Sequence, residues 1–277
     1  MTPRDLLPAA IARLRAAGVA DPARDARLLL AHALALPADR LTLHLDATVA
    51  EAAVTRLEAA LAARASRQPV SQIVGHRQFW GREFVVTPDV LDPRPETEIL
   101  IAAALERPFA RVLDLGAGSG AILLTLLAER LQAQGLGVDL SDAALAVARA
   151  NAEALGVAGR CELRRSDWFE RVDGRFDLIV ANPPYLGATE MGELAPETRD
   201  WEPAEALLGG ADGLDAYRAI AAGAGGHLSP GGRLWLEIGP TQREAVTALL
   251  AAAGFTVIGC RTDFDGRDRV VEARWPG

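Results

Sequence analysis

Residues 1–72 place apolar side chains at the three- and four-residue spacing of one helix face. The spacing recurs in two segments, at Ala26, Leu29, Leu30, Ala33 and Leu34 and at Val54, Leu57, Ala60 and Leu61. Thr2 precedes Pro3 and Asp21 precedes Pro22, which is the N-cap and first-turn proline pattern of a helix start. We predict a small helical domain over residues 1–72, acting either as a stabilising cap or as a module that docks a partner.

The hydrophobic period changes between Ser71 and Pro95. The stretch IVGHRQFWGREFVVTPDV has β-branched and aromatic residues on both sides of Trp80 and Gly81. Because glycine supplies the positive φ of a tight turn, the pattern predicts a β-hairpin. We place this hairpin at residues 73–92, as the connector between two domains.

From Arg111 onward, short apolar runs alternate with helical segments. The runs are RVLDL, LGVDL, CELRR, FDLIVAN, RLWLEI, FTVIGC and RVVEARW. This alternation predicts an α/β domain over residues 93–277, with a mostly parallel sheet covered by helices on both faces. Ligands of such sheets bind at the carboxyl ends of the strands, so the residues that follow each strand are the candidates for function.

Composition and charge narrow the class of protein. Of the 277 residues, 50% are hydrophobic and 24% are charged, which is typical of a soluble globular enzyme. No apolar stretch is long enough for a membrane span, and Asp5 and Arg13 interrupt any signal peptide. Cys161 and Cys260 fit neither a disulfide framework nor a zinc site, so we expect a cytoplasmic protein without a metal. The net charge of −8 argues against broad nucleic-acid binding.

The first strand of the predicted sheet runs into a glycine-rich loop, DLGAGSG at residues 114–120. Gly116, Gly118 and Gly120 let the backbone turn tightly and approach a ligand beside a helix start, with Ala117 and Ser119 between them. No Gly-Lys-Ser/Thr follows, and the third glycine comes too early for the usual dinucleotide motif. Asp139 ends the next strand, where a carboxylate accepts from both hydroxyls of a ribose. Together they predict an adenosine-type cofactor.

The third strand is followed by Ser166, Asp167, Trp168 and Phe169. Asp167 can accept from an adenine amino group, and Trp168 can cover the adenine ring. The alternative is a surface acid beside a tryptophan that packs in the core.

The fourth strand ends in Asn182-Pro183-Pro184-Tyr185, the most specific signal in the chain. The prolines fix φ and remove two backbone donors, so the loop offers carbonyl acceptors beside an asparagine amide and an aromatic ring. A planar NH₂ group suits this loop, with its N–H bonds held by the Asn182 side-chain oxygen and the Pro183 carbonyl and with Tyr185 against its plane. The proton of a nitrogen held in this way could leave to solvent after it has reacted, so no histidine is needed as a base. The four histidines lie outside these loops.

With these motifs in view, the chain resembles the release-factor glutamine N5-methyltransferases, which are class I S-adenosylmethionine-dependent methyltransferases with a Rossmann-like sheet. The resemblance covers nearly the whole chain: the helical layout of the first residues, PVSQIVGHRQFWGREFVV, DPRPETE, DLGAGSG, SDWF, NPPY, WEPAEALLGGADGLDAYR and GRDRVV. Ala117 stands where the family more often has threonine. We expect little effect, because the backbone of this loop does the binding.

The resemblance implies S-adenosyl-L-methionine as cofactor, S-adenosyl-L-homocysteine as product, and a class-1 peptide-chain release factor as protein substrate. The acceptor would be the glutamine of the Gly-Gly-Gln motif of that factor. The implied cofactor-binding residues are Gly116, Ala117, Gly118, Ser119, Gly120, Asp139, Asp167, Trp168 and Asn182. Asn182, Pro183, Pro184 and Tyr185 would bind the substrate, and Asn182, Pro183 and Tyr185 would carry the catalysis.

Two alternatives remain open at this point. An exocyclic amine of a flipped base in DNA or RNA also fits an Asn-Pro-Pro-Tyr loop, although the acidic charge opposes it. A cofactor-fold scaffold without turnover is the second. Arg94 and Glu96 in DPRPETE either position the methionine end of the cofactor or clamp the hairpin, and capping or salt bridging explains them nearly as well.

Overall fold

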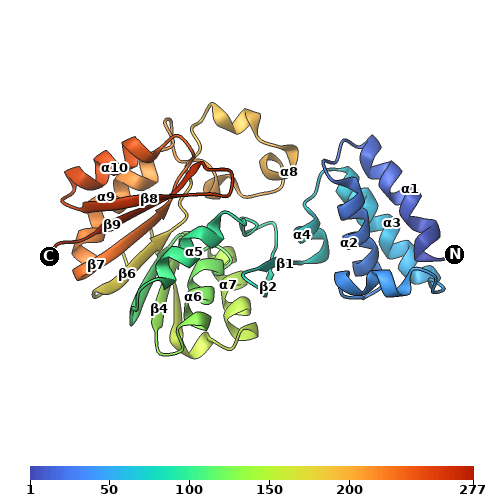
Figure 1. Ribbon diagram of the computed structural model, residues 1–277, viewed down its shortest axis with the longest axis horizontal. Helices are drawn as coiled ribbons and strands as arrows, with labels where there is room; N and C mark the ends of the chain where they lie inside the picture. Colours follow the sequence, from blue (N-terminus) through green and yellow to red (C-terminus); the bar gives the residue numbers. More distant parts are fainter. The chain divides into compact units, whose positions relative to one another are not determined.

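The computed structural model describes residues 1–277, which separate into two compact units. One unit consists of Met1–His76 and Ala195–Trp201, and the other of Arg77–Leu194 and Glu202–Gly277. Figure 1 draws the first helices in blue and the larger, sheet-containing unit in green through red. The boundaries proposed at residues 72 and 92 stay predictions, and the segment Ala195–Trp201 lies outside the helical domain as we predicted it.

The first unit is helical. Its elements are α1 (Pro3–Ala16), α2 (Pro22–Ala33), the 3-10 helix η1 (Ala38–His44), α3 (Glu51–Ala65), α4 (Val70–Val74) and α8 (Pro196–Arg199). The side chains of Thr2 and Asp21 accept from the backbone N–H groups of Asp5 and Arg24, so both predicted helix starts are confirmed. The apolar faces meet in one core around Leu14, Leu29, Leu30, Leu41 and Leu57.

The short helix α8 is held to this unit by buried charge. Arg64 of α3 is 5% exposed and pairs at 2.8 Å with Asp25 of α2 and at 2.8 Å with Glu197 of α8. Arg67 donates to the other Glu197 oxygen at 2.7 Å. Because breaking a pair that involves a buried charge such as Arg64 costs roughly 3 to 5 kcal/mol, these pairs fix α8 on the helical unit.

The predicted hairpin is present, with β1 (His76–Phe79) and β2 (Arg82–Val85) forming a two-stranded sheet around a turn at Trp80 and Gly81. Its role as a domain connector stays a prediction. The buried side chain of Asn151 donates to the backbone oxygens of Val85 and Ser119 and accepts from Val85 N–H. One asparagine thus ties the hairpin to the glycine-rich loop.

The main sheet has seven strands in the order β5-β4-β3-β6-β7-β9-β8. They are β3 (Arg111–Leu115), β4 (Gln134–Asp139), β5 (Cys161–Arg165), β6 (Phe176–Ala181), β7 (Leu228–Glu237), β8 (Thr256–Thr262) and β9 (Asp268–Arg274). The first five are parallel and β9 is antiparallel to both of its neighbours. The helices between them are α5 (Thr97–Leu105), α6 (Ala121–Glu129), α7 (Asp142–Ala154), α9 (Asp215–His227) and α10 (Arg243–Ala252). Short 3-10 turns complete the unit: η2 (Ala158–Arg160), η3 (Glu190–Glu193) and η4 (Ala204–Ala206).

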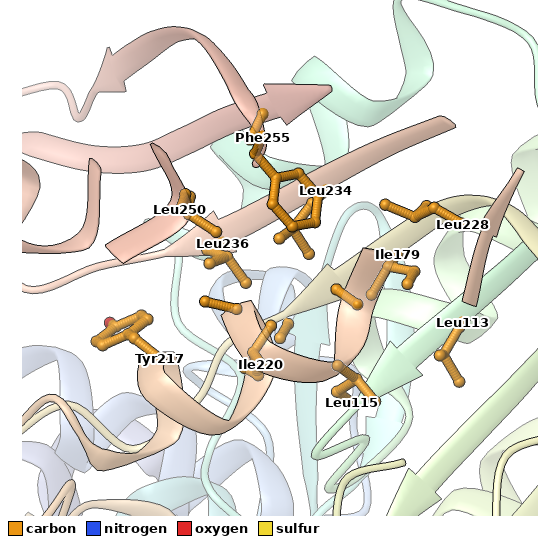
Figure 2. Packing of buried hydrophobic residues seen from close by; sticks show 14 of the residues in the cluster. Leu113, Leu115, Ile179, Tyr217, Ile220, Leu228, Leu234, Leu236, Leu250 and Phe255 are labelled. Carbon is orange, nitrogen blue, oxygen red and sulfur yellow. The ribbon is translucent and has the colours of Figure 1, made fainter. Parts of the chain in front are cut away.

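Alternate residues of the central strands enter two different cores. Leu178 and Val180 of β6 pack with α5 and α6, whereas Ile179 of the same strand packs with α9 and α10. Figure 2 shows the second core, where Tyr217 and Ile220 lie among side chains of the sheet. Helices therefore cover both faces, and the predicted fold class is confirmed. No helix combines the length and the apolar character that crossing a bilayer requires.

Candidate active site

A cavity of about 430 Å³ opens where β3, β4 and β6 end. Its predicted lining residues are Gly116, Ala117, Gly118, Ser119, Asp139, Trp168, Asn182 and Pro184. Gly120, Asp167, Pro183 and Tyr185, also proposed from the sequence, do not line it. The structure thus brings three strand ends with most of the proposed residues to one cavity, as the strand-end rule requires.

The glycine-rich loop leaves open space in the cavity next to its backbone. Gly116 and Gly118 have φ of +73° and +54°, and a Cβ built on either would meet no protein atom within 4 Å. The N–H groups of Gly116 and Ala117 both donate to Val138 O at 2.9 Å, so these two donors are already used within the protein. The loop therefore leaves a space next to backbone that a side chain would fill.

Asp139 at the end of β4 holds this loop in place. Its Oδ2 accepts from Gly118 N–H at 2.9 Å, and its Oδ1 accepts from Ser141 N–H at 2.9 Å. Each carboxylate oxygen keeps a further lone pair, so Asp139 can still accept from a ligand in the cavity that it lines. One side chain thus orients the loop and faces the ligand.

Trp168 also lines the cavity, with an unusual backbone φ of +41°. Bulky residues rarely adopt positive φ, and Ser166 Oγ stabilises the turn by donating to Trp168 O at 3.0 Å and accepting from Arg171 N–H at 3.0 Å. The neighbouring Asp167 is exposed outside the cavity lining. The adenine contact suggested for Asp167 stays a prediction.

The loop of residues 182–185, which follows β6, also contributes to the cavity wall. Asn182 and Pro184 line the cavity, whereas Pro183 is buried. Tyr185 packs against the core of α9 and α10, and its carbonyl accepts from Gln242 Nε2 at 2.8 Å. Burial raises the pKa of the Tyr185 phenol, so the ring is a neutral neighbour of the site.

Two residues that the sequence did not suggest stand behind Asn182. Asn182 Nδ2 donates to Thr97 Oγ1 at 3.3 Å, and that hydroxyl donates to Glu237 Oε2 at 2.7 Å. Thr97 begins α5 and Glu237 ends β7, so the pairs join residues 85 and 140 positions apart. Thr97 lies in the DPRPETE segment, but no local motif shows that it pairs with Asn182 or Glu237.

Arg94 lines the cavity as well, and Glu202 accepts from its Nη2 at 2.5 Å. Burial raises the pKa of Glu202 to about 7, against the opposing charge of Arg94. The structure thus supports salt bridging for Arg94 and also brings it to the cavity. Further lining residues absent from our prediction include Val90, Thr97, Ile122, Pro203 and Ala206.

The cavity fits an adenosine-type cofactor. Gly116 and Gly118 leave space where any side chain would intrude, Asp139 supplies a carboxylate at the end of β4, and Trp168 supplies an aromatic surface. The lining also includes apolar residues such as Val90, Ile122 and Val138, which suits a ligand with a sugar, a base and an aliphatic arm.

Comparison with known proteins identifies both parts of the chain. Residues 5–75 match the family model "PrmC N-terminal domain", and residues 79–195 match "Methyltransferase small domain". A release factor glutamine methyltransferase from Cereibacter sphaeroides is 63% identical over 100% of this chain and 99% of its own length. A protein of the same name from Agrobacterium fabrum is 43% identical over 96% of this chain and 95% of its own length.

Solved structures agree with the fold. A methyltransferase from Pyrococcus furiosus superposes with a TM-score of 0.55 at 18% identity, covering 72% of this chain and 91% of that chain. A 16S rRNA methyltransferase from Thermus thermophilus, solved with AdoMet and guanosine, gives a TM-score of 0.51 at 25% identity over 72% of this chain and 49% of that chain. The chain is an S-adenosylmethionine-dependent methyltransferase, and it belongs to the family of release factor glutamine methyltransferases.

Proposed function

We propose that this enzyme transfers the methyl group of S-adenosylmethionine to the side-chain amide nitrogen of the glutamine in the Gly-Gly-Gln motif of class-1 peptide-chain release factors. The observation that carries the proposal is the position of Asn182. Its side chain lines the same cavity as the glycine-rich loop and Asp139, and its Oδ1 has no hydrogen-bond partner within the protein. The family membership supplies the identity of the acceptor.

The cofactor side of the cavity holds the nucleoside in this proposal. Asp139 accepts from the ribose hydroxyls, Trp168 covers the adenine, and the glycine-rich loop lets the ligand approach the backbone closely. Bound there, S-adenosylmethionine supplies an electrophilic methyl carbon on a sulfonium.

On the acceptor side, Asn182 Oδ1 accepts one N–H of the glutamine amide. The resemblance to the family implies that the carbonyl of Pro183, a buried residue beside the lining residues Asn182 and Pro184, accepts the other. These bonds aim the nitrogen at the methyl carbon and push electron density onto it, which compensates for the weak nucleophilicity of an amide. The proton leaves to solvent after the bond has formed. No histidine lines the cavity, which agrees with a transfer that does not depend on a histidine base.

For the helical unit we propose docking of the release factor. The residues that we propose for the cofactor all belong to the larger unit. The match of residues 5–75 to the model "PrmC N-terminal domain", separate from the methyltransferase domain model, supports a role other than cofactor binding. The role of residues 73–92 as a connector belongs to the same proposal.

The test uses the full-length chain, a purified class-1 release factor and methyl-labelled S-adenosylmethionine. Peptide mass spectrometry should place the label on the side-chain nitrogen of the Gly-Gly-Gln glutamine. A release factor with that glutamine replaced by alanine is the matched control, and bare DNA and RNA oligonucleotides are the competing acceptors. Label on another residue, or on the oligonucleotides in preference to the release factor, would refute the proposed function.

A further inference from the structure

A chain of three polar side chains runs from the core of the larger unit to the cavity. Glu237 is 1% exposed and Thr97 is 4% exposed, while Asn182 lines the cavity. The hydrogen bonds are 2.7 Å between Thr97 Oγ1 and Glu237 Oε2 and 3.3 Å between Asn182 Nδ2 and Thr97 Oγ1. Thr97 belongs to α5 and Glu237 to β7, while Asn182 lies in the loop directly after β6.

The chemistry of these groups fixes the direction of both bonds. An ionised carboxylate only accepts, so the single proton of the Thr97 hydroxyl is used by Glu237. Thr97 Oγ1 can then only accept, and the NH₂ group of Asn182 is the end of that amide which can donate to it. Reversing the amide would set two acceptors against each other.

The orientation of the Asn182 amide decides what the cavity offers to an acceptor. With Nδ2 bound to Thr97, Oδ1 is the atom left to receive an N–H bond from the acceptor nitrogen. With the amide reversed, an NH₂ group would meet the NH₂ group of the glutamine, and two donors cannot bond to each other. Only one of the two orientations supports methyl transfer.

We propose that Thr97 and Glu237 are positioning residues, which set the Asn182 amide so that its oxygen faces the acceptor nitrogen. The inference rests on the proposed function, because it gives the amide of Asn182 its part in the reaction. Thr97 and Glu237 act through Asn182 and take no part in binding the methyl group. Their contribution is rigidity and direction, which a flexible asparagine side chain lacks when nothing is bound behind it.

Glu237 must be ionised for the direction to hold. Burial raises its pKa to about 7, and the Thr97 hydroxyl bond and the nearby charge of Arg269 favour the ionised form. At pH 8 the carboxylate therefore predominates. The experiments below use that pH.

The main test compares three variants of the full-length enzyme at pH 8, with a purified release factor as substrate. Thr97→Val removes the hydroxyl and keeps the branched shape. Thr97→Ser keeps the hydroxyl. Thr125→Val makes the same change at a buried threonine of α6 whose hydroxyl has no hydrogen-bond partner, and so serves as the matched control.

We expect Thr97→Val to lower kcat by about ten- to a hundredfold, by analogy with the partners that orient metal-ligating side chains. The Kd of S-adenosylmethionine and the KM of the release factor should stay within about threefold of the parent. Thr97→Ser should restore kcat to within about threefold, and Thr125→Val should leave it unchanged. Where Thr97→Val does not fold, as judged by circular dichroism, Thr97→Ala removes the same hydroxyl without placing a methyl group beside Glu237.

A double-variant cycle separates positioning from general damage. If Thr97 acts through Asn182, adding Thr97→Val to Asn182→Ala should produce no further loss of kcat. A structural effect would multiply the two losses. Parental kcat in Thr97→Val, failure of serine to rescue it, or multiplicative losses in the double variant would each overturn this inference alone. A parent enzyme that does not label the glutamine would overturn the proposed function and this inference with it.

Discussion

The two sides of the cavity are built in different ways. The cofactor side depends on backbone: Gly116 and Gly118 hold positive φ, and Asp139 receives the N–H groups of Gly118 and Ser141. The acceptor side depends on side chains, because the orientation of Asn182 is set by a threonine from another element. A side chain added at Gly116 or Gly118 would fill the space that the backbone leaves for the ligand. The hydrogen bonds that join Asn182, Thr97 and Glu237 are broken when one hydroxyl or amide is lost. The two sides should therefore respond to different substitutions and change different kinetic constants.

The strongest separation should come from Gly118→Val. Valine at φ +54° is strained by about 1 to 2 kcal/mol, and its methyl groups would enter the cavity, where no protein atom now lies within 4 Å. We expect the Kd of S-adenosylmethionine to rise by about a hundredfold or more, measured by calorimetry. Gly159→Val is the control, because Gly159 is exposed and also has open space at Cβ but is not held at positive φ. Equal cofactor affinity in the two variants would contradict the view that the backbone at Gly118 leaves space for the cofactor.

Asn182→Ala should have the complementary effect. This change removes the preorganised amide that holds the reacting nitrogen, so kcat should fall by about a hundredfold. The Kd of S-adenosylmethionine should change by less than about threefold. Asn182→Asp should keep partial activity, because a carboxylate oxygen still accepts an N–H bond although it has no proton for Thr97. Single-turnover methylation of the release factor measures both. Parental kcat in the alanine variant would show that the acceptor is held elsewhere.

The same difference explains how much of the site could be predicted from the sequence. The cofactor side is encoded in contiguous residues: the glycines of 114–120 follow one strand, and Asp139 follows the next. The fold rule that gathers strand ends then places them together. Thr97 and Glu237 could not be predicted, because their bonds span 85 and 140 residues and depend on strand order and helix placement. Pairing of this kind is a property of the tertiary structure.

The secondary structure was more predictable than the assembly of the units. Helix starts at Thr2 and Asp21 follow from local capping chemistry, and both side chains cap as predicted. The side chain of Ser141 caps α7 by the same chemistry. By contrast, the segment Ala195–Trp201 joins the helical unit through Glu197, which pairs with Arg64 and Arg67, far earlier in the chain. Its sequence, with one proline and mixed charges, carries no sign of that attachment.

A smaller effect is expected at Asp139, and it sharpens the description of the cofactor side. Asp139→Ala removes a ribose acceptor and also frees the N–H of Gly118, so the Kd of S-adenosylmethionine should rise by about tenfold or somewhat more. At saturating cofactor, kcat should stay within about threefold of the parent. Asp142→Ala is the matched control, because this nearby aspartate is exposed and pairs only with exposed Arg165. A large loss of kcat in Asp139→Ala would mean that the two sides are not independent.

The smallest effect concerns pH, and its sign follows from the surroundings of Glu237. Arg269 on β9 and Arg94 before α5 favour the carboxylate, Glu96 opposes it, and burial outweighs them to raise the pKa to about 7. The nearby phenols of Tyr185 and Tyr217 are neutral, since burial raises the pKa of both. Because the pKa lies above its unfolded value, the contribution of Glu237 to stability is greatest in acid and is lost as pH rises through about 7. Ionised Glu237, which the hydrogen bond from Thr97 requires, therefore stabilises the folded protein less than protonated Glu237 does.

Activity should consequently move against stability over this range. Below pH 7 a protonated Glu237 can donate to Thr97, which frees the threonine hydroxyl to bond the oxygen of Asn182 and reverse the amide. We expect kcat at saturating substrates to fall by up to about tenfold between pH 8 and pH 6, since about a tenth of a group with pKa near 7 stays ionised at pH 6. Thr97→Val should have a flat profile, because without the hydroxyl the protonation of Glu237 no longer reaches Asn182. Burial also raises the pKa of Asp114 and of Glu202 to about 7, and those groups are unchanged in the variant. A profile that kept its slope in Thr97→Val would assign the pH dependence to one of them and remove Glu237 from the acceptor side of the site.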